Sequence, residues 1–445
     1  AAANEALNVE PVPEAAGNFH ITDDNLGIGG PKQKFARNIE AIQTLRTLEQ
    51  EHRGATAEEQ QVLSQYVGWG GLADAFDPNK ENWSTEYTQL KGLLTEEEYA
   101  AARASTLNAH YTSPIVIRAI YDAVERMGFQ SGNILEPSMG VGNFFGMLPD
   151  SMADSRLYGV ELDSITGRIA QKLYPQADIT VAGFETTDRR DFYDLAIGNV
   201  PFGQYKVNDK AYNKLGFSIH NYFFAKTIDQ IRPGGVIAFV TSHFTMDSKD
   251  SSARKYMAER ANLLGAIRLP NDAFKANAGT EVVSDIIFLQ KRDRPADIEP
   301  AWVQPGQTED GFTLNSYFVE HPEMILGHMI RDTGRFGENS NLTACVNDDP
   351  DFDLQEALSR AVSNIHAQIT DFERTVEEGE EPEEYLPADP DVKNFTYTFI
   401  DGVLYFRKDS RMVRQEVGDK VLERIKGMDA IRTATRHLID IQLSG

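Results

Sequence analysis

Short apolar segments alternate with amphipathic ones through the middle of the chain. Segments short enough to be buried strands occur at residues 133–136, 157–163, 194–198, 236–240 and 282–289. A helical stretch at residues 221–231 stands between the third and the fourth of them, and a Pro-Gly-Gly turn follows it. Strands that alternate with helices in this way predict an α/β fold, a Rossmann-like open sheet with helices on both faces. We place this sheet domain at residues 108–295.

The region before the sheet has a helical pattern. Apolar residues recur at helical spacing over Ala36–His52 and Glu58–Val67, and Thr56 precedes the second segment as a candidate N-cap. Residues 21–107 are therefore predicted to form a helical N-terminal region. Residues 1–20 hold little that could be buried and are predicted to be a disordered leader.

Two glycine-rich points interrupt this helical region, at residues 26–30 and 67–71. Both are typical of tight turns. Trp69, which stands between glycines, could instead be a surface anchor close to a ligand, and we favour the turn.

Residues 296–445 depart from the rhythm of the sheet domain and predict an acidic α+β C-terminal extension or connector. A helix is expected at Asp353–Val376 and a terminal helix at Lys420–Gln442. Between them, alternating apolar residues on either side of Asp401-Gly402 predict a β-hairpin.

The composition narrows the class of protein. The 445 residues suffice for about three domains, and no stretch approaches the roughly 20 apolar residues of a membrane span. No charged-then-apolar leader is present, so we expect a soluble, cytoplasmic protein. The single cysteine, Cys345, excludes an internal disulfide and a cysteine cluster, and the nine histidines show no ligand spacing, so no metal is expected. Because the chain begins with Ala1 rather than Met, we read it as a piece of a longer protein.

The net charge of −25 opposes the simplest picture of a DNA-binding protein, because phosphate contacts need Lys and Arg. About half of the excess lies in residues 348–391, where fifteen acidic residues stand against Arg360 and Arg374. We interpret the acidic run at residues 377–384 as a solvated loop. An acidic mimic of DNA that masks the site is the alternative.

The first predicted strand runs into a glycine-rich turn, EPSMGVGNF, at Glu136–Phe144. Gly140 and Gly142 let the backbone approach a ligand that a Cβ would obstruct. Glu161 ends the next strand about twenty residues later, where a dinucleotide fold places the carboxylate that binds ribose hydroxyls. Nicotinamide-binding proteins and S-adenosylmethionine-dependent enzymes share these features. The turn lacks the Gly-x-Gly-x-x-Gly that receives a pyrophosphate, which favours the second class.

Asn199-Val200-Pro201-Phe202 follows the third predicted strand. The amino group of a base such as adenine is a poor nucleophile, because its lone pair is delocalised into the ring. The Asn199 side-chain oxygen and the Val200 carbonyl can accept hydrogen bonds from it and draw its nitrogen toward a tetrahedral geometry. Pro201 fixes the backbone, and Phe202 offers a face on which a flipped-out base can stack. The plain alternative is an ordinary loop after a buried strand.

The segment that follows, residues 203–216, is polar and too irregular for a strand. It carries three lysines, Lys206, Lys210 and Lys214. We predict a mobile loop over the site that contacts nucleic-acid backbone, with a plain surface loop as the alternative.

The order of these motifs resembles that of the gamma-type N6-adenine DNA methyltransferases, which include restriction-modification enzymes. The matching elements are His110–Pro114, Glu136–Phe144, Glu161 and Asn199–Phe202, and the resemblance spans about residues 108–292. It implies transfer of a methyl group from S-adenosylmethionine to the amino group of adenine. The family usually has proline at the second place of the tetrapeptide, where this chain has Val200.

The resemblance also assigns residues. It implies a catalytic role for Asn199, Val200, Pro201 and Phe202, and contact of Thr112 with the cofactor carboxylate, of Glu161 with its ribose and of Phe184 with its adenine. The implied cofactor-binding residues are Tyr111, Thr112, Glu136, Pro137, Gly140, Gly142, Asn143, Phe144, Glu161, Leu162, Phe184 and Asn199.

The flanks carry a second resemblance. The segments DDNLGIGGPKQKFARNIEAI and YVGWGGL, with the NVPFG variant, resemble the N-terminal methyltransferase region of very large phage and conjugative-element proteins, in which an SNF2-like helicase follows. Some of these proteins take part in escape from host restriction. The implied partners are DNA with a flipped-out adenine and a helicase region of the same full-length protein, since no Gly-Lys-Ser/Thr loop occurs in this chain.

Two other hypotheses remain open. An amino-methyltransferase that acts on RNA or on a protein glutamine shares the tetrapeptide. A catalytically weak or inactive module could instead bind cofactor, DNA or a partner in an antirestriction role.

Overall fold

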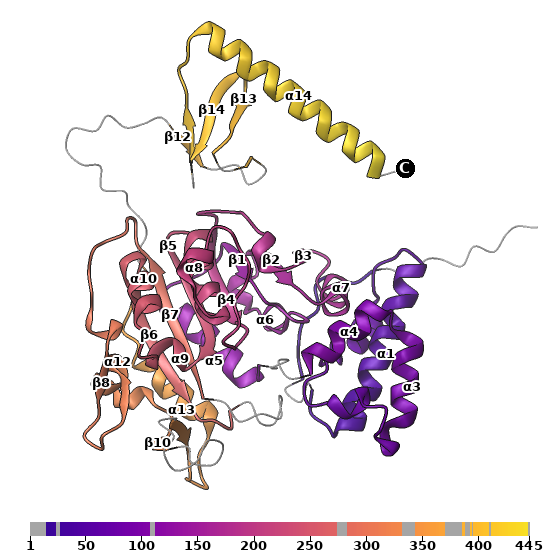
Figure 1. Ribbon diagram of the computed structural model, residues 1–445, viewed down its shortest axis with the longest axis vertical. Coiled ribbons are helices and arrows are strands. Elements are labelled where there is room, and N and C mark those ends of the chain that lie inside the picture. Colours follow the sequence, from indigo (N-terminus) through magenta and orange to yellow (C-terminus); the bar gives the residue numbers. More distant parts are fainter. Residues whose placement is uncertain are drawn as a thin grey trace, which may run out of the picture.

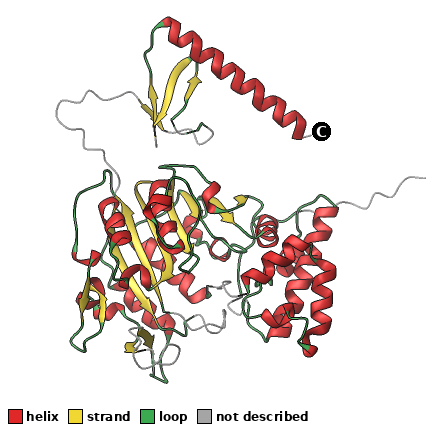
Figure 2. Ribbon diagram, viewed as in Figure 1, coloured by secondary structure: helices red, strands yellow, loops and turns green. Residues whose placement is uncertain are grey.

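A seven-stranded sheet forms the centre of the structure (Figures 1 and 2). The computed structural model describes residues 15–23, 27–106, 112–273, 283–331, 343–369, 385–387, 392–393, 395–408 and 411–443. The strand order is β3-β2-β1-β4-β5-β7-β6, and neighbours are parallel except that β7 is antiparallel to β5 and β6. The bounds are β1 Asn133–Glu136, β2 Arg156–Glu161, β3 Asp178–Val181, β4 Tyr193–Asn199, β5 Ile231–Ser242, β6 Ala261–Leu269 and β7 Ser284–Lys291.

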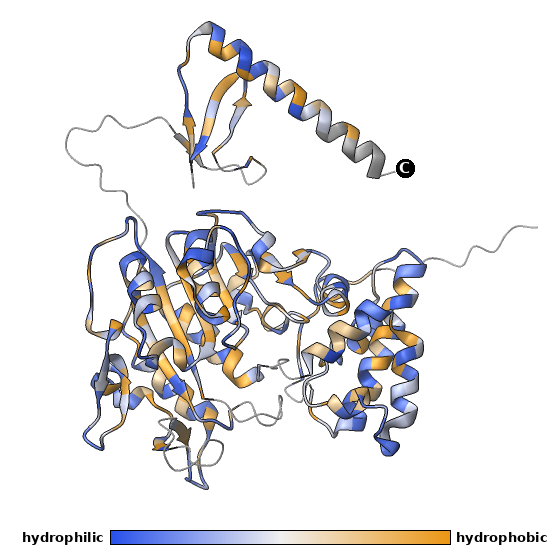
Figure 3. Ribbon diagram, in the orientation of Figure 1, coloured by the Kyte–Doolittle hydropathy of each residue, from blue (hydrophilic) through white to orange (hydrophobic). Residues whose placement is uncertain are grey.

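The inner strands are apolar along their length because both of their faces are covered. Residues 195–197 of β4, 236–240 of β5 and 286–289 of β7 are buried, and Figure 3 shows hydrophobic residues running along these strands. The predicted strands of the sheet are confirmed. The Pro-Gly-Gly segment lies within β5, where its pairing with β4 shifts register, rather than in a turn before it.

Helices cover both faces of the sheet. The strand order reverses at β1, so the connections from β1 to β2 and from β4 to β5 run in opposite directions. Because such crossovers are right-handed, the helices of the two halves lie on opposite faces. The flanking helices are α5 Pro114–Arg126, α6 Asn143–Gly146, α7 Ser164–Leu173, α8 Ile219–Gln230, α9 Phe244–Asp247 and α10 Ser252–Arg260, with short 3-10 turns at Asp150–Met152, Phe184–Thr186 and Asn213–Leu215.

The N-terminal region is helical, as predicted, and packs on α7. Arg168 of α7 pairs with Glu49 at 2.9 Å and with Glu98 at 2.7 Å, which joins the helical region to the sheet domain. Thr56 caps the second helix through a capping box with Glu59. The helices are α1 Pro31–Gln50, α2 Ala57–Ser64, α3 Ser84–Leu93 and α4 Glu96–Ser105, with 3-10 turns at Ala73–Phe76 and Glu81–Trp83.

Two expectations for this region are settled by its packing. The prediction of a disordered leader is wrong for residues 15–20: Phe19 is buried and its backbone N–H donates to the Leu173 carbonyl at 2.8 Å. Residues 1–14 lie outside the described residues. Trp69 is buried beside Phe35 and Phe76, so the turn interpretation is confirmed and the surface anchor is wrong.

The first part of the predicted C-terminal extension packs into the core of the sheet domain. Asn315 donates through Nδ2 to the Met246 carbonyl at 2.8 Å, and α13 packs on α5. A boundary at residue 296 therefore does not coincide with a break in packing. The elements are the 3-10 turns Ala301–Val303 and Pro322–Met324, β8 Pro305–Gln307, β9 Thr313–Asn315, α12 Ser316–Glu320, β10 His328–Arg331, β11 Thr343–Val346 and α13 Leu354–Ser363.

The helix predicted at Asp353–Val376 is shorter than expected. It ends at Ser363. The N–H groups of Asn364 and Ile365 donate to carbonyls of the last helical turn, and the N–H of Ile369 donates to the Met127 carbonyl. The acidic run at 377–384 lies outside the described residues.

The last described elements form a small sheet and a long helix (Figure 1). The hairpin through Asp401-Gly402 is confirmed, with Ile400 paired to Val403, and the terminal helix is confirmed as α14 Asp419–Leu443. The strands, in the order β12-β15-β14-β13, are β12 Tyr385–Pro387, β13 Tyr397–Ile400, β14 Val403–Lys408 and β15 Arg411–Arg414. Across the described helices, none is both long and apolar enough to cross a membrane.

Candidate active site

The carboxyl ends of β1, β2 and β4 meet where the strand order reverses. β1 ends at Glu136, β2 at Glu161 and β4 at Asn199, and β1 is the neighbour of both others. An open α/β sheet binds ligands in the crevice at this point, because the loops on either side diverge there. Three motifs that are far apart in the sequence are thus brought together.

The glycine loop after β1 keeps its backbone accessible. Gly140 has φ of 56°, and a Cβ built on it would meet no atom within 4 Å, so a ligand can lie against this residue. Gly142 has φ of 83°, and its Cβ would lie 2.5 Å from the Tyr174 ring. Gly142 is thus required by close packing and Gly140 leaves open space, so the two glycines serve different purposes.

Two carboxyl groups line the crevice. Glu161 accepts hydrogen bonds from the N–H groups of Gly140 and Asp163, both at 2.8 Å, one on each oxygen. Each oxygen keeps a second lone pair for a hydroxyl donor. Burial raises the pKa of Glu161 to about 7, against the opposing effect of these N–H donors.

Glu136 is the more deeply buried of the two carboxyl groups. Burial and the neighbouring Glu161 raise its pKa well above the usual value, because both disfavour the charged form. Its Oε2 atom is buried, and no described residue hydrogen-bonds to it. A buried polar atom of this kind is available to a ligand.

Asn199 is held by the two loops beside it. Its Nδ2 atom donates to Thr112 Oγ1 at 3.0 Å, and its backbone carbonyl accepts from Ser138 Oγ at 3.0 Å. The Nδ2 bond orients the amide, and the remaining Oδ1 atom is buried without a hydrogen-bond donor among the described residues. Asn199 therefore presents an acceptor with a fixed direction.

Val200 has a structural role that proline could not fill. It is buried, and its N–H donates to the Val240 carbonyl at 3.1 Å, one residue beyond the ladder of β4 and β5. Proline has no N–H. The departure from the usual tetrapeptide thus adds an anchor for the loop, and the carbonyl of Val200 is unaffected by the change of side chain.

The other residues of the predicted site are placed as follows. Pro201 and Phe202 are half-buried after β4, Thr112 is buried before α5, and Pro137 begins the glycine loop. Leu162, which follows Glu161, is 76% exposed. Tyr111 lies outside the described residues.

Three predicted cofactor residues belong to α6 or to the turn after β3. Phe144 is buried, and its carbonyl accepts from the Tyr121 hydroxyl at 2.7 Å. Asn143 begins α6 beside it. Phe184 is buried and stacks on Phe223 with ring centroids 4.8 Å apart. Their roles toward a cofactor stay predictions.

Two residues that the sequence patterns did not single out contribute to the site. Ser138 holds the Asn199 carbonyl, and Ser113, at the N-cap position of α5, has a buried hydroxyl with no partner among the described residues. Ser113 precedes a proline at the first helical position, a pattern that could have marked it as the N-terminus of a helix. Nothing in the sequence signals the contact of Ser138.

The segment after Phe202 is anchored to α8. Asp209 accepts hydrogen bonds from the Tyr222 hydroxyl at 2.9 Å and pairs with the buried Lys226 at 2.8 Å. Asp209 and Tyr212, whose hydroxyl donates to Asp229 of α8, are thus fixed to this helix, and mobility of the rest of the segment stays a prediction. In the part of the chain that the structure describes, no group of three or more His, Cys, Asp or Glu could hold a metal ion.

The strand order with one antiparallel strand, β7, together with the glycine loop and the acid that ends β2, decides the fold. This strand order is that of the class I S-adenosylmethionine-dependent methyltransferase fold. Among solved structures the chain is similar to a protein described as such a methyltransferase from Listeria monocytogenes, with 17% identity, a TM-score of 0.37 and coverage of 60% of this chain and 90% of that one. A type I restriction enzyme modification subunit from Vibrio vulnificus shows 18% identity, a TM-score of 0.35 and coverage of 54% of each chain.

Two curated proteins are similar in sequence. Defense against restriction protein B of Escherichia phage P1 is 29% identical over 307 residues, which make up 67% of this chain and 12% of that protein. Type II methyltransferase M.CvrRI of Paramecium bursaria Chlorella virus XZ-6E is 37% identical over 79 residues, 18% of this chain and 21% of that enzyme. This chain thus spans a small part of both relatives. No protein-family model matches it.

Proposed function

We propose that this chain is an S-adenosylmethionine-dependent DNA methyltransferase module that methylates the amino group of adenine, within a larger phage or mobile-element protein. The observation that carries the proposal is Asn199 Oδ1, a buried acceptor oriented by Thr112 and left without a donor among the described residues. The amino group of a flipped-out adenine supplies the donor that this atom lacks. The similarity to a phage antirestriction protein and to a type II methyltransferase supports the choice of DNA.

The residues of the crevice fit the cofactor. Gly140 leaves space for the methionine part, Glu161 has lone pairs for ribose hydroxyls, and Thr112 lies just before the N-terminus of α5, which favours a carboxylate. S-adenosylmethionine would supply an electrophilic methyl group on its sulfonium. Nothing in the described residues of the crevice requires a metal or a covalent intermediate.

The protein's contribution to the reaction is to position the amino group. Asn199 Oδ1 and the Val200 carbonyl accept the two amino hydrogens, so that the nitrogen lone pair leaves conjugation with the ring. These two acceptors would hold the amino nitrogen ready for the methyl group that bound S-adenosylmethionine would supply, and one proton of the amino group would leave for solvent. Phe202 holds the base by stacking.

The proposal is tested by methyl transfer from labelled S-adenosylmethionine to mixed-sequence DNA, RNA and protein. We expect label on DNA, recovered as N6-methyladenine after digestion. Label on RNA or on protein glutamine alone would replace DNA by that substrate. Calorimetry without substrate separates a further outcome: a chain that binds S-adenosylmethionine and methylates nothing is a binding module, and one that does not bind it is no methyltransferase.

Cofactor affinity is expected to rise with pH up to about 8 and then to level off. Ribose hydroxyls donate to the ionised Glu161, whose pKa lies at about 7, so binding expels a proton. Below pH 7 the affinity should therefore fall by up to about tenfold for each pH unit. The stability of the free protein has the opposite pH dependence. The stabilisation associated with the protonated Glu161 carboxyl is present below its ordinary pKa of 4.5 and is lost as pH rises through about 7.

Isothermal titration at several pH values checks this dependence. Glu161→Gln preserves the shape of the side chain and removes its titration, so this variant should bind weakly and with a flat pH profile. A wild-type affinity that does not change between about pH 6 and 8 would show that Glu161 does not bind the ribose.

A further inference from the structure

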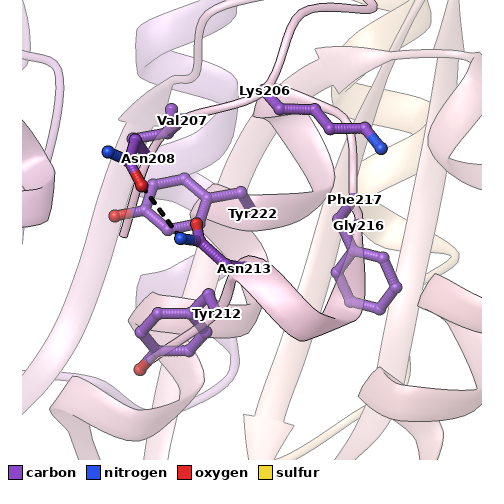
Figure 4. Close-up of a pocket in the computed structure, with 8 residues that line it drawn as sticks. All are labelled: Lys206, Val207, Asn208, Tyr212, Asn213, Gly216, Phe217 and Tyr222. Atoms are coloured by element: carbon purple, nitrogen blue, oxygen red, sulfur yellow. Dashed lines mark hydrogen bonds between the residues drawn. The ribbon is translucent and has the colours of Figure 1, made fainter. Parts of the chain in front are cut away.

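The segment after the candidate catalytic motif forms the wall of a pocket. The pocket has a volume of about 290 Å³ (Figure 4). This is close to the lower bound of about 300 Å³ for sites that hold drug-sized ligands, so the pocket suits a ligand as small as one nucleobase with its sugar. Six of its lining residues carry the argument: Lys206, Asn208, Tyr212, Asn213, Phe217 and Tyr222.

The pocket has a rigid frame. Asp209 lies in the wall segment and accepts from Tyr222 and from Lys226, whose side chain is 5% exposed. The Tyr212 hydroxyl donates to Asp229 of α8 at 2.6 Å. A buried ion pair is costly unless its geometry is good, so these bonds define one arrangement of the segment against α8.

The lining combines flat apolar surface with amide groups. The rings of Tyr212 and Tyr222 are perpendicular, with centroids 5.6 Å apart, and Phe217 lies across the pocket from them (Figure 4). Asn213 donates through Nδ2 to Asn208 Oδ1 at 2.9 Å, which leaves the Asn208 amide nitrogen available as a donor. Aromatic faces and amides are the groups that bind nucleobases, by stacking and by hydrogen bonds to the base edge.

The segment that forms the pocket wall is basic although the protein is acidic. Lys206, Lys210 and Lys214 are exposed, and none of them forms an ion pair with another described residue. The one acid of the segment, Asp209, is neutralised by Lys226. Three unpaired cations on a chain of net charge −25 are complementary to a phosphate backbone.

The pocket is close in sequence to the proposed base-stacking residue. Phe202 precedes Gly203, and the Tyr205 ring lies so close to Gly203 that a Cβ there would be 2.5 Å from it. Tyr205, which lies in the sequence between Phe202 and the pocket residues, is 49% exposed and offers a further aromatic side chain. A strand whose adenine stacks on Phe202 would thus continue along this segment.

We propose that this pocket binds a nucleobase that neighbours the target adenine on the same strand, with Lys206, Lys210 and Lys214 contacting its phosphates. This inference rests on the proposed function. A base enters a pocket only when it is unpaired and unstacked. The substrate is therefore single-stranded or locally melted DNA rather than intact duplex.

The test is the binding of a fluorescein-labelled, mixed-sequence single-stranded DNA to the full chain, followed by anisotropy, with the matching duplex and a single-stranded RNA as comparisons. We expect the single strand of DNA to bind most tightly. Phe217→Leu keeps an apolar side chain but removes the stacking face, and it should weaken binding of the single strand about 5- to 100-fold. Circular dichroism establishes that the variant is folded.

The lysines are tested by their salt dependence. Replacing Lys206, Lys210 and Lys214 together by glutamine should make the slope of log K against log salt shallower by about 2 for single-stranded DNA. The matched control replaces Lys420, Arg424 and Lys426 of α14, which are also exposed, and should leave the slope nearly unchanged.

Each outcome decides the proposal. Duplex bound as tightly as the single strand, or a Phe217→Leu variant that binds like wild type, overturns it, and tighter binding of RNA replaces DNA by RNA. Because this test measures binding, it is independent of the proposed function. If single-stranded DNA binds in a way that depends on Phe217 but no methyl group is transferred, the proposed function fails and the pocket proposal stands. If the Phe217→Leu variant and the triple lysine variant both methylate DNA at the wild-type rate, the pocket has no role in the reaction, and the proposed function is unaffected.

Discussion

Asn199→Ala is expected to lower methyl transfer by about 100- to 1,000-fold while S-adenosylmethionine still binds. The alanine removes Oδ1, the oriented acceptor, and with it one of the two hydrogen bonds that localise the lone pair of the amino nitrogen. Thr112 and Ser138 hold Asn199 in place, and each contacts it through an atom other than Oδ1. The measurement is single-turnover transfer of labelled methyl, with calorimetry for the cofactor.

Two further variants define the effect of Asn199. Asn262→Ala makes the same truncation at an exposed position near the beginning of β6, an edge strand of the sheet, and should transfer at the wild-type rate. Thr112→Val keeps Oδ1 but removes the acceptor that orients the amide, so its loss should be smaller. Normal transfer by the Asn199 variant would refute the catalytic role of the tetrapeptide.

Arg268→Met is expected to lower the free energy of unfolding by about 3–5 kcal/mol, because it leaves buried carboxylates without their counter-charge. Arg268 and Asp285 are fully buried and paired across β6 and β7 by two bonds of 2.8 and 2.9 Å. A third nitrogen of Arg268 lies 2.7 Å from Asp247, and its guanidinium lies over the Phe318 ring. One cation thus joins the two strands β6 and β7 to the helices α9 and α12.

Urea unfolding followed by far-ultraviolet circular dichroism measures this loss, at two pH values. In the variant the carboxyl groups escape part of the penalty by binding protons, so the destabilisation should be larger at about pH 8 than at about pH 5. Asp285→Asn is the matched comparison: it leaves Arg268 paired with Asp247 and should cost less. Equal losses for the two variants would show that the unpaired charge is not the cause.

The elements governed by local chemistry were predicted from the sequence. The strand that ends at Glu136, the N-cap at Thr56 and the hairpin at Asp401-Gly402 each depend on neighbours within a few residues, so their sequence patterns can be recognised without knowledge of the fold. The order of the motifs also placed Gly140, Glu161 and Asn199 at strand ends, where a parallel sheet brings them together. The fold class followed from the same alternation of strands and helices.

Contacts between distant residues could only be established by the tertiary structure. Phe19 looked like part of a polar leader and is held by the Leu173 carbonyl, and Trp69 is enclosed by aromatic residues from three segments. The sequence does not predict the pairing of Asp209 with Lys226 or of Arg268 with Asp285, because charged residues are expected at the surface. Periodicity records which face of a segment is apolar, but the partner that buries a charge or orients an amide is selected by packing alone.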